Sequence, residues 1–424
     1  MLTGTTRIIS KAVRTNRAIF ITGFVLILVT GRCLIHAETS AKLIRVFEPA
    51  SDLADISDDG KLILAVETQK RKCADKKNVC LSEVLVVYET STGKKLGELE
   101  NRDKKWGLFS AASFVREDIV GAFENSRSVW IEWNFENGLI QEKKILFEPE
   151  SQVVCFTSDK RLLLKKRVGP LEKLSTLDPV SLSAESIQQS VLPIGHFDCK
   201  GWKRASSYLL ETETEKHRIS LSLISSKPEV LSQGCQIVPN EETYNHTVSP
   251  DGSIIAIITG IGGQGTVMDD VLGPEDKTFL NLFDGSTCGR NKRFELQFPE
   301  QPKLKAPLLA PKNKYYANAR LKTMFAKRLA ISPDNSKLAI GYGIRTGGIY
   351  SDSIAYYGIY SMQDGHRIIT LKADSYKFSN WEALFSDMAP MWWAPLDGIL
   401  RFGPDSKKLF AGSKRIWQWD LSPF

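Results

Sequence analysis

The segment Thr247-Val-Ser-Pro-Asp-Gly-Ser-Ile-Ile-Ala-Ile-Ile-Thr-Gly260 decides the fold, because the chain contains the same pattern in several copies. Two clear copies are Leu329-Ala-Ile-Ser-Pro-Asp-Asn-Ser-Lys-Leu-Ala-Ile-Gly-Tyr342 and Leu400-Arg-Phe-Gly-Pro-Asp-Ser-Lys-Lys-Leu-Phe-Ala-Gly412, and Leu53-Ala-Asp-Ile-Ser-Asp-Asp-Gly-Lys-Leu-Ile-Leu-Ala-Val66 differs by losing the proline. In each copy, two apolar runs flank a turn in which Pro presets φ, Asp bonds its own backbone, and Gly or Asn tolerates a positive φ. Each copy therefore predicts a β-hairpin.

A third strand and a second turn follow the hairpins, as in Glu83–Gly93 and then Lys95–Leu99. The predicted unit is a four-stranded antiparallel meander, whose strands we call a to d in chain order. The a-b turns are expected near Asp58, Glu117, Ser158, Ala205, Asp251, Asp334 and Asp405. The units near 117, 158 and 205 rest on alternating runs such as Ser128–Trp133 and Arg218–Ile224 instead of turn motifs. The chain therefore predicts seven units.

The last unit ends at Leu421 after only three strands, so one of its edges lacks a partner strand. Leu43–Phe47 alternates apolar and polar residues and precedes the first hairpin with no turn partner of its own. An open strand edge favours pairing with such a segment. We therefore expect an all-β fold, a seven-bladed β-propeller of four-stranded antiparallel blades that is closed by the N-terminal strand.

These motifs resemble those of the WD-repeat β-propeller family over about residues 43 to 421. The resemblance lies in the Ser-Pro-Asp-Gly hairpins, the Leu-Ala-x-Gly second strand and the Trp419-Asp420 dipeptide. The family's Gly-His dipeptide occurs once, as Gly195-His196, which makes the chain more similar to exported bacterial propellers than to the eukaryotic signalling type. The resemblance implies structural roles for Trp419, Asp420 and the turn aspartates.

The first 37 residues have the pattern of a signal peptide. A cationic stretch up to Arg17 precedes an apolar run, Ala18–Gly31, that is shorter than the roughly 18 to 20 residues of a membrane span. Cleavage after Ala37 leaves residues 38–424 as a single propeller domain and places the protein outside the cytoplasm, periplasmic or secreted. A retained signal anchor and a cytosolic amphipathic extension remain open alternatives. No later stretch has the length of a membrane span.

Net charge gives no reason to expect specific binding of nucleic acid. The chain has 56 Lys and Arg against 49 Asp and Glu, a formal charge of +7. Five of these cations lie in the leader, which contains no acidic residue: Arg7, Lys11, Arg14, Arg17 and Arg32. The rest of the chain is almost neutral, whereas proteins that bind nucleic acid typically have a strongly basic domain or stripe.

Six cysteines follow the leader, an even number that suits three disulfides in an oxidising compartment: Cys73, Cys80, Cys155, Cys199, Cys235 and Cys288. A bridge between Cys73 and Cys80 is expected because they flank a short polar loop between adjacent strands. Of the three pairings open to the others, we prefer Cys155 with Cys199 and Cys235 with Cys288, which join neighbouring blades. Partly buried free thiols are the alternative. With no paired C-x2-C spacing and scattered histidines, no metal site and no cofactor are predicted.

Long segments are expected at one face of the propeller. In a four-stranded meander, the b-c and d-a connections emerge on the opposite face from the a-b and c-d turns. The long segments are Gln69 to Leu81, Gly260 to Lys277, Pro299 to Lys327, Ile344 to Ser353 and Ala373 to Asp397, all of which are b-c or d-a connections. Since loops longer than about 12 to 15 residues are usually functional or disordered, this face is the predicted functional face.

Two of these loops supply the candidate ligand-binding residues. An aromatic loop, 376 to 393, carries a predicted short amphipathic helix and Trp381, Trp392 and Trp393. A basic loop, 303 to 328, carries Lys312, Lys314, Tyr315 and Tyr316. Aromatic side chains can stack on sugar or apolar faces, and the lysines attract anions. A lid packed over the channel and a solvated basic loop are the simpler alternatives.

We therefore expect a non-catalytic propeller that binds a protein or polymer partner through its b-c and d-a loops. The partner could be anionic. The chain has no G-x-S-x-G, no H-E-x-x-H and no histidine in a nucleophile context. The alternative is a propeller enzyme or electron-transfer subunit, similar to quinoprotein dehydrogenases or lactonases, with a metal or cofactor at the channel mouth.

Overall fold

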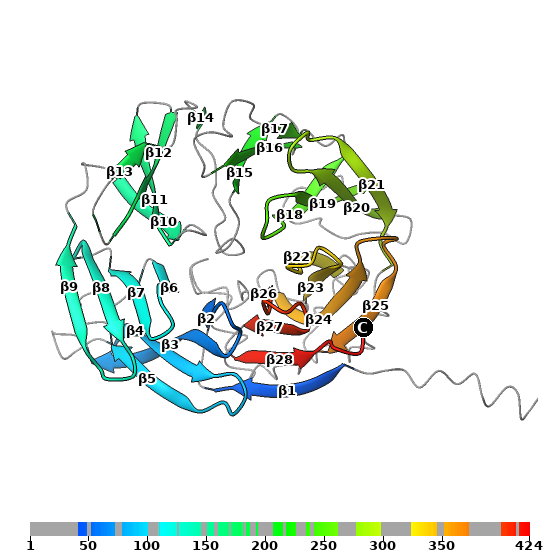
Figure 1. Ribbon diagram of the computed structural model, residues 1–424. Helices are drawn as coiled ribbons and strands as arrows, with labels where there is room; N and C mark the ends of the chain where they lie inside the picture. The colour runs from blue at the N-terminus through cyan, green and yellow to red at the C-terminus, as the bar shows by residue number, and fades with distance from the viewer. Residues whose placement is uncertain are drawn as a thin grey trace, which may run out of the picture. The chain divides into compact units, whose positions relative to one another are not determined.

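Short antiparallel strands joined by tight turns make up the described part of the molecule (Figure 1). The computed structural model describes residues 41–48, 52–72, 79–100, 109, 111–124, 127–145, 151–156, 160–168, 171–179, 181, 184–186, 192–193, 207–214, 218–225, 235–237, 241–261, 277–297, 324–345, 352–372, 400–412 and 415–424. These residues contain strands and turns and no helix. The prediction of an all-β, antiparallel chain is confirmed for them.

The described strands form seven sheets, which we number in chain order; five have four strands, one has five and one has three. Sheet 1 comprises β2(Asp52–Ile56), β3(Leu62–Lys72), β4(Val79–Glu89) and β5(Lys95–Glu100). Sheet 2 comprises β6(Ala111–Phe114), β7(Ile119–Glu124), β8(Val129–Asn134) and β9(Ile140–Lys144). Sheet 3 comprises β10(Ser151–Phe156), β11(Leu162–Val168), β12(Leu171–Leu177), β13(Ala184–Ser186) and β14(Leu192–Pro193).

Sheets 4 to 7 follow in the same way. Sheet 4 comprises β15(Ser207–Thr214), β16(Arg218–Ser225) and β17(Cys235–Ile237). Sheet 5 comprises β18(Glu242–Val248), β19(Ile254–Ile261), β20(Lys277–Asp284) and β21(Arg290–Glu295). Sheet 6 comprises β22(Met324–Ile331), β23(Lys337–Arg345), β24(Asp352–Ser361) and β25(Arg367–Lys372). Sheet 7 comprises β26(Leu400–Phe402), β27(Lys408–Gly412), β28(Ile416–Asp420) and β1(Lys42–Phe47). Consecutive meanders of this kind are consistent with a β-propeller.

The first strand of the chain pairs with the last one. β1 runs antiparallel to β28, with Leu43 opposite Trp419 and Phe47 opposite Ile416. Figure 1 shows β1, in blue, beside β28, in red. Arg45 extends from β1 to sheet 1, where its guanidinium donates to the carbonyls of Ser91 (2.7 Å) and Thr92. This is the strand pairing that the sequence led us to expect, and it satisfies an edge of β28 that would otherwise be open.

The repeated hairpins share one hydrogen-bond pattern. In sheets 1, 5 and 6 a serine hydroxyl donates to the aspartate two residues later and accepts from the backbone N–H five residues later, at 2.9 Å in each case. The three serines are Ser57, Ser249 and Ser332. The residue after each turn aspartate has a positive φ, as the turn chemistry predicted: Gly60, Gly252, Asn335 and, in sheet 7, Ser406.

Sheets 3 and 4 differ from regular four-stranded blades. In sheet 3, β13 pairs with the end of β12 and β14 with its beginning, so two short strands share the edge where one strand d was expected. Sheet 4 has three described strands, and the predicted turn near Ala205 lies outside the described residues. Neither unit has a turn motif in its sequence, which is consistent with its irregular strands.

Three predicted loops are shorter than expected, because the flanking strands continue into them. Gln69 to Leu81 is mostly hairpin, since β3 and β4 remain paired as far as Lys72 opposite Val79. Ile344 pairs with Ser353, and Met324–Lys327, which the sequence placed in a loop, belong to β22. Polar residues make up Gln69–Lys72 at the end of β3, where cross-strand backbone pairing continues without apolar side chains, whereas Met324–Lys327 at the start of β22 is mostly apolar.

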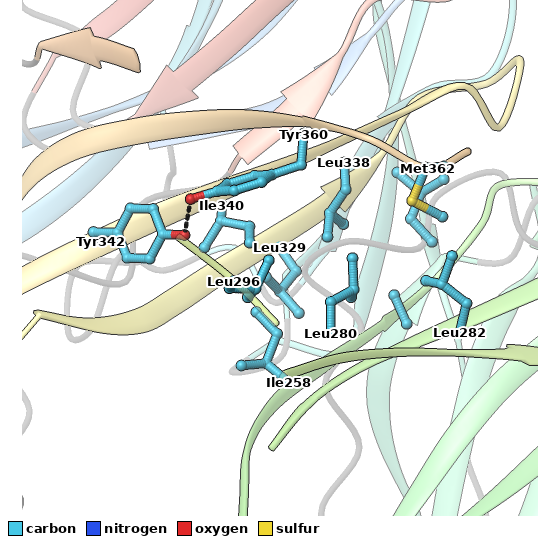
Figure 2. Packing of buried hydrophobic residues seen from close by; sticks show 12 residues of the cluster. Ile258, Leu280, Leu282, Leu296, Leu329, Leu338, Ile340, Tyr342, Tyr360 and Met362 are labelled. Atoms are coloured by element: carbon cyan, nitrogen blue, oxygen red, sulfur yellow. Dashed lines mark hydrogen bonds between the residues drawn. The ribbon is translucent and has the colours of Figure 1, made fainter. Parts of the chain in front are cut away.

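The apolar core lies between neighbouring sheets. Figure 2 shows the cluster between sheets 5 and 6, in which Ile258, Leu280 and Leu282 face Leu329, Leu338 and Ile340. Similar clusters join sheet 1 to sheet 2, sheet 2 to sheet 3 and sheet 7 to sheet 1. Between sheets 6 and 7, the rings of Tyr357 and Trp419 are 5.3 Å apart. At these interfaces, neighbouring sheets cover each other's apolar side chains.

A buried tyrosine pair closes one end of the cluster in Figure 2. The hydroxyls of Tyr342 and Tyr360 are 2.5 Å apart, and the Tyr360 hydroxyl donates to the Gln297 carbonyl at 3.0 Å. Gly358 makes room for the two rings, since a Cβ there would lie 2.6 Å from the Tyr360 ring. Burial raises the pKa of Tyr360 to about 12, against lowering by its hydrogen bond with Tyr342 and by Arg367. Burial raises the pKa of Tyr342 as well, so both hydroxyls stay protonated at neutral pH.

Candidate functional site

The ligand-binding residues expected from the sequence lie outside the described part of the structure: Lys312, Lys314, Tyr315, Tyr316, Trp381, Trp392 and Trp393. The same holds for the predicted helix within 376 to 393 and for the leader, 1–37. The described strands nevertheless define where these segments leave the sheets. The basic segment joins β21 to β22, and the aromatic segment joins β25 to β26.

The long connections leave the sheets from one edge. Those between β19 and β20 (Ile261 to Lys277), β21 and β22 (Glu295 to Met324), and β25 and β26 (Lys372 to Leu400) join a strand b to c or a strand d to a. The a-b and c-d connections of the described sheets 1, 2, 5 and 6 are all short turns. Antiparallel strands reverse direction at each turn, so the two classes of connection lie at opposite edges of each sheet. We call these edges the loop edge and the turn edge.

Hairpin turns of neighbouring sheets are bonded to one another at the turn edge. The Asn335 amide of sheet 6 donates to the Asp251 carboxylate (2.9 Å) and to the Ser253 hydroxyl (3.1 Å) of sheet 5. The backbone N–H of Asp334 donates to Ser406 Oγ of sheet 7 at 3.1 Å. These bonds hold consecutive hairpins in one relative position.

A small inner cavity lies where the first strands of sheets 1, 5, 6 and 7 meet. Its volume is about 60 Å³, and its lining includes Asp55, Thr247, Pro250, Pro333, Arg401 and Pro404. A cavity of this volume and polarity has room for a few water molecules. The three prolines belong to the repeated hairpin turns, so the repeated motif shapes this space.

Asp55 and Arg401 form a buried ion pair in this cavity. Asp55 is 4% exposed and Arg401 is 9% exposed, and their closest atoms, Oδ1 and Nη1, are 3.4 Å apart. Arg401 Nη1 also donates to the Ala54 carbonyl at 3.2 Å. Asp55 Oδ2 accepts from the Phe114 N–H at 3.0 Å and from the Ser113 hydroxyl. Asp55 of sheet 1 thus contacts sheets 2 and 7.

The larger cavity is an open groove between sheets 5 and 6 at the turn edge, which we call the turn groove. Its volume is about 710 Å³, and its lining includes Ile254, Leu282, Lys292, Asn335, Lys337 and Met362. Gln363, His366, Ile368 and Phe424 also contribute. The sequence analysis missed this groove, because it is formed by residues of two sheets that no single motif contains.

Polar contacts join the two walls of the turn groove. Lys292 Nζ of sheet 5 donates to the Gln363 carbonyl of sheet 6 at 2.9 Å and approaches the Met362 carbonyl at 3.4 Å. His366 Nδ1 lies 2.6 Å from Asp364 Oδ1 at the rim. Hydrogen bonds from Ser361 and His366 lower the pKa of Asp364 to about 2. Asp364 is therefore ionised at neutral pH and is engaged with its own turn.

The described residues contain no group of three or more His, Cys, Asp or Glu side chains that is arranged to hold a metal ion. Among the same residues, no helix is long and apolar enough to cross a membrane.

Cys288 is disulfide-bonded and lies in the turn between β20 and β21. Its expected partner, Cys235, is the first residue of β17, and the side chain of Cys235 is outside the described part. Cys80 lies in β4 opposite Arg71, whereas Cys73 and Cys199 are outside the described residues and Cys155 is described by its backbone alone. The three predicted pairings therefore stay predictions.

No protein-family model matches the chain, and no curated protein matches it. Solved structures similar to it include hydrazine synthase from Kuenenia stuttgartiensis, with 12% identity and a TM-score of 0.49 over 92% of this chain and 99% of that chain. An oligogalacturonate lyase in complex with manganese has 13% identity and a TM-score of 0.48 over 90% and 98%. U3-55K has 9% identity and a TM-score of 0.47 over 90% and 98%. At these identities no residue role is transferred to this chain.

Proposed function

We propose that the protein is an exported, non-catalytic β-propeller that binds a protein or polymer partner at its loop edge. In this proposal the seven sheets are the blades of one WD-repeat-like propeller that spans residues 38–424, and β1 closes it. The partner is contacted by the aromatic and basic segments, with Trp381, Trp392 and Trp393 as stacking groups and Lys312, Lys314, Tyr315 and Tyr316 beside them.

The unequal connection lengths carry this proposal. In sheets 1, 2, 5 and 6 the connections at the turn edge are short and hydrogen-bonded, whereas the three longest connections between described strands all join strands at the loop edge. Binding residues are concentrated on loops that a rigid scaffold positions. The β21–β22 and β25–β26 connections are the d-a connections on either side of sheet 6, so the basic and the aromatic segments start from neighbouring sheets.

A capture experiment tests the proposal. The purified protein is immobilised and exposed to an extracytoplasmic extract of the source cells, and the retained partner is compared between the natural chain and a Trp381→Ala/Trp392→Ala/Trp393→Ala variant. We expect the variant to lose capture while its melting temperature stays within a few degrees. Capture of an anionic partner should also weaken as salt rises, because salt screens the lysines.

A second variant separates lost binding from lost folding. Lys312→Gln/Lys314→Gln removes two charges without touching an aromatic side chain, and Lys61→Gln/Lys407→Gln removes two charges at the turn edge as the control. The loop-edge pair should reduce capture and the turn-edge pair should not. Equal capture by all variants, or a tryptophan variant that unfolds together with a lysine pair that has no effect, would refute binding at the loop edge.

A further inference from the structure

We propose that the turn groove is a second binding site, and that its ligand is a small organic anion: a carboxylate attached to an alkyl or aromatic body. The site lies at the turn edge, opposite to the loop edge of the proposed function. It is independent of that function, because no residue of either loop segment takes part in it.

The groove has the size and the apolar floor of a small-molecule site. Its volume, about 710 Å³, falls within the range of roughly 300 to 1,000 Å³ that is typical of ligand pockets. Ile254 and Leu282 of sheet 5 form one side, and Met362 and Ile368 of sheet 6 form the other. An apolar ligand body placed between them removes further apolar surface from water, which favours binding.

The charged side chains that line the groove are cationic. Lys337 begins β23 at one wall, and its ammonium group lies 3.4 Å from Ser336 Oγ, a weak contact that leaves it able to bind an anion. Lys292 is bonded to backbone carbonyls across the groove and adds a second positive charge. A carboxylate that enters the groove therefore meets two ammonium groups, and a charge-assisted hydrogen bond of this kind is stronger than one between neutral groups.

The aspartates near the groove do not cancel this preference, because their carboxylates are bonded within the turns. Asp251 accepts from Ser249, Ser253 and Asn335, and Asp334 accepts from Ser332 and Ser336. None of these aspartates lines the groove. Asp364, at the rim, is paired with His366.

Asn335 carries a buried polar atom beside the groove. Its Nδ2 is bonded to sheet 5, whereas its Oδ1 is shielded from solvent and has no hydrogen-bond partner. An acceptor in that position costs free energy until a donor reaches it.

The groove is also held in shape before any ligand binds. Asn335 ties the hairpin of sheet 6 to that of sheet 5, and Lys292 ties β21 to the β24–β25 turn. A preorganised site avoids the entropic cost of ordering its own walls when it binds. The shared apolar cluster beneath it, shown in Figure 2, adds to this rigidity.

Binding of 8-anilinonaphthalene-1-sulfonate, an anion with an apolar body, tests the proposal through its fluorescence. Dodecanoate is added as a competitor, and dodecanol is the neutral competitor of the same length. We expect saturable fluorescence that dodecanoate displaces at least tenfold more effectively than dodecanol does. Hydrogen exchange measured by mass spectrometry should show that dodecanoate protects the amides of residues 361–368.

Two lysine variants locate the site. Lys337→Glu places a negative charge in the groove and should weaken dodecanoate binding by about tenfold or more. Lys408→Glu is the matched control, because Lys408 begins β27 at the same position of the sheet 7 hairpin and does not line the groove. Equal affinities in the two variants, equal competition by dodecanol, or protection confined to other segments would overturn the proposal. None of these results depends on partner capture at the loop edge.

Discussion

Arg401 Nη1 lies 3.4 Å from Asp55 Oδ1, although 346 residues separate the two in the sequence. The pair joins the inner strand of sheet 7 to the inner strand of sheet 1, at the same junction where β1 pairs with β28. The two ends of the described chain are thus held together by a strand pairing and by a buried ion pair. Buried pairs of this kind are costly to break, since the remaining charge loses its partner.

Arg401→Met should lower the free energy of unfolding by about 3 kcal/mol, because it leaves Asp55 buried beside an uncharged side chain. Urea denaturation followed by tryptophan fluorescence measures the change. The control is Lys61→Met, which removes the exposed partner of Asp59 and should alter stability by no more than about 0.5 kcal/mol. Similar midpoints for the two variants would mean that the buried pair does not stabilise this junction.

Gly403→Ser should raise the melting temperature. Gly403 occupies the hairpin position that Ser57, Ser249 and Ser332 occupy in sheets 1, 5 and 6. A serine hydroxyl there can donate to Asp405 and accept from the Lys408 N–H, as its counterparts do, and a hydrogen bond adds about 1 kcal/mol. The reverse change, Ser332→Gly, should lower the melting temperature by a similar amount. A Gly403→Ser variant that melts below the natural protein would show that the contact between its Cβ and Asp405 is too close.

Gly121→Ala should destabilise the fold by about 2 kcal/mol, because a Cβ at Gly121 collides with the ring of Trp130, which is 1% exposed. The control is Gly289→Ala, since a Cβ there meets only the hydroxyl of Thr287, at 3.3 Å. Chemical denaturation should show a clear shift for the first variant and a shift within about 0.5 kcal/mol for the second. Equal shifts would mean that Trp130 moves without cost.

Acid should destabilise the hairpins between about pH 4 and pH 2. Burial raises the pKa of Asp334, but hydrogen bonds from Ser332 and Ser336 outweigh this effect and lower the pKa to about 2. The pKa of Asp59 is also lowered to about 2, because its hydrogen bonds outweigh the effect of burial. An aspartate whose pKa is lower in the folded state than in the unfolded state stabilises the fold at pH values above its unfolded pKa, near 3.9. This contribution is lost as pH falls through the folded pKa. Melting temperatures at pH 7, 4, 3 and 2 measure the effect.

The variant Asp334→Asn isolates one hairpin in this acid series. It should be less stable than the natural protein at pH 7, because it loses the charge that the turn stabilises. The difference between the two should shrink as pH falls to 2, where the natural aspartate is protonated as well. A difference that stays constant across the series would contradict the role of the ionised carboxylate.

Local sequence was enough to predict the hairpins, because each depends on contacts within a few residues. The Ser57, Ser249 and Ser332 turns close through bonds to an aspartate and a backbone N–H inside the same turn. The strands that follow were predicted from their alternating apolar residues. Where turn motifs were absent, as in sheets 3 and 4, the prediction lost the details of the outer strands. Strand ends were also misplaced at β3, β4 and β22, where backbone pairing continues beyond the residues that the sequence pattern assigned to strands.

The amino-acid sequence by itself therefore determined that the chain forms antiparallel meanders, that Leu43–Phe47 is a strand, and that long connections gather at one edge. Only the tertiary structure decided that Asp55 meets Arg401 and that Lys292, Asn335 and Lys337 border one groove. The physical reason is the range of the interactions. The type of a turn depends on residues that are neighbours in the chain. Contacts between sheets depend on how entire meanders pack, and no local sequence pattern predicts which side chains that packing brings together.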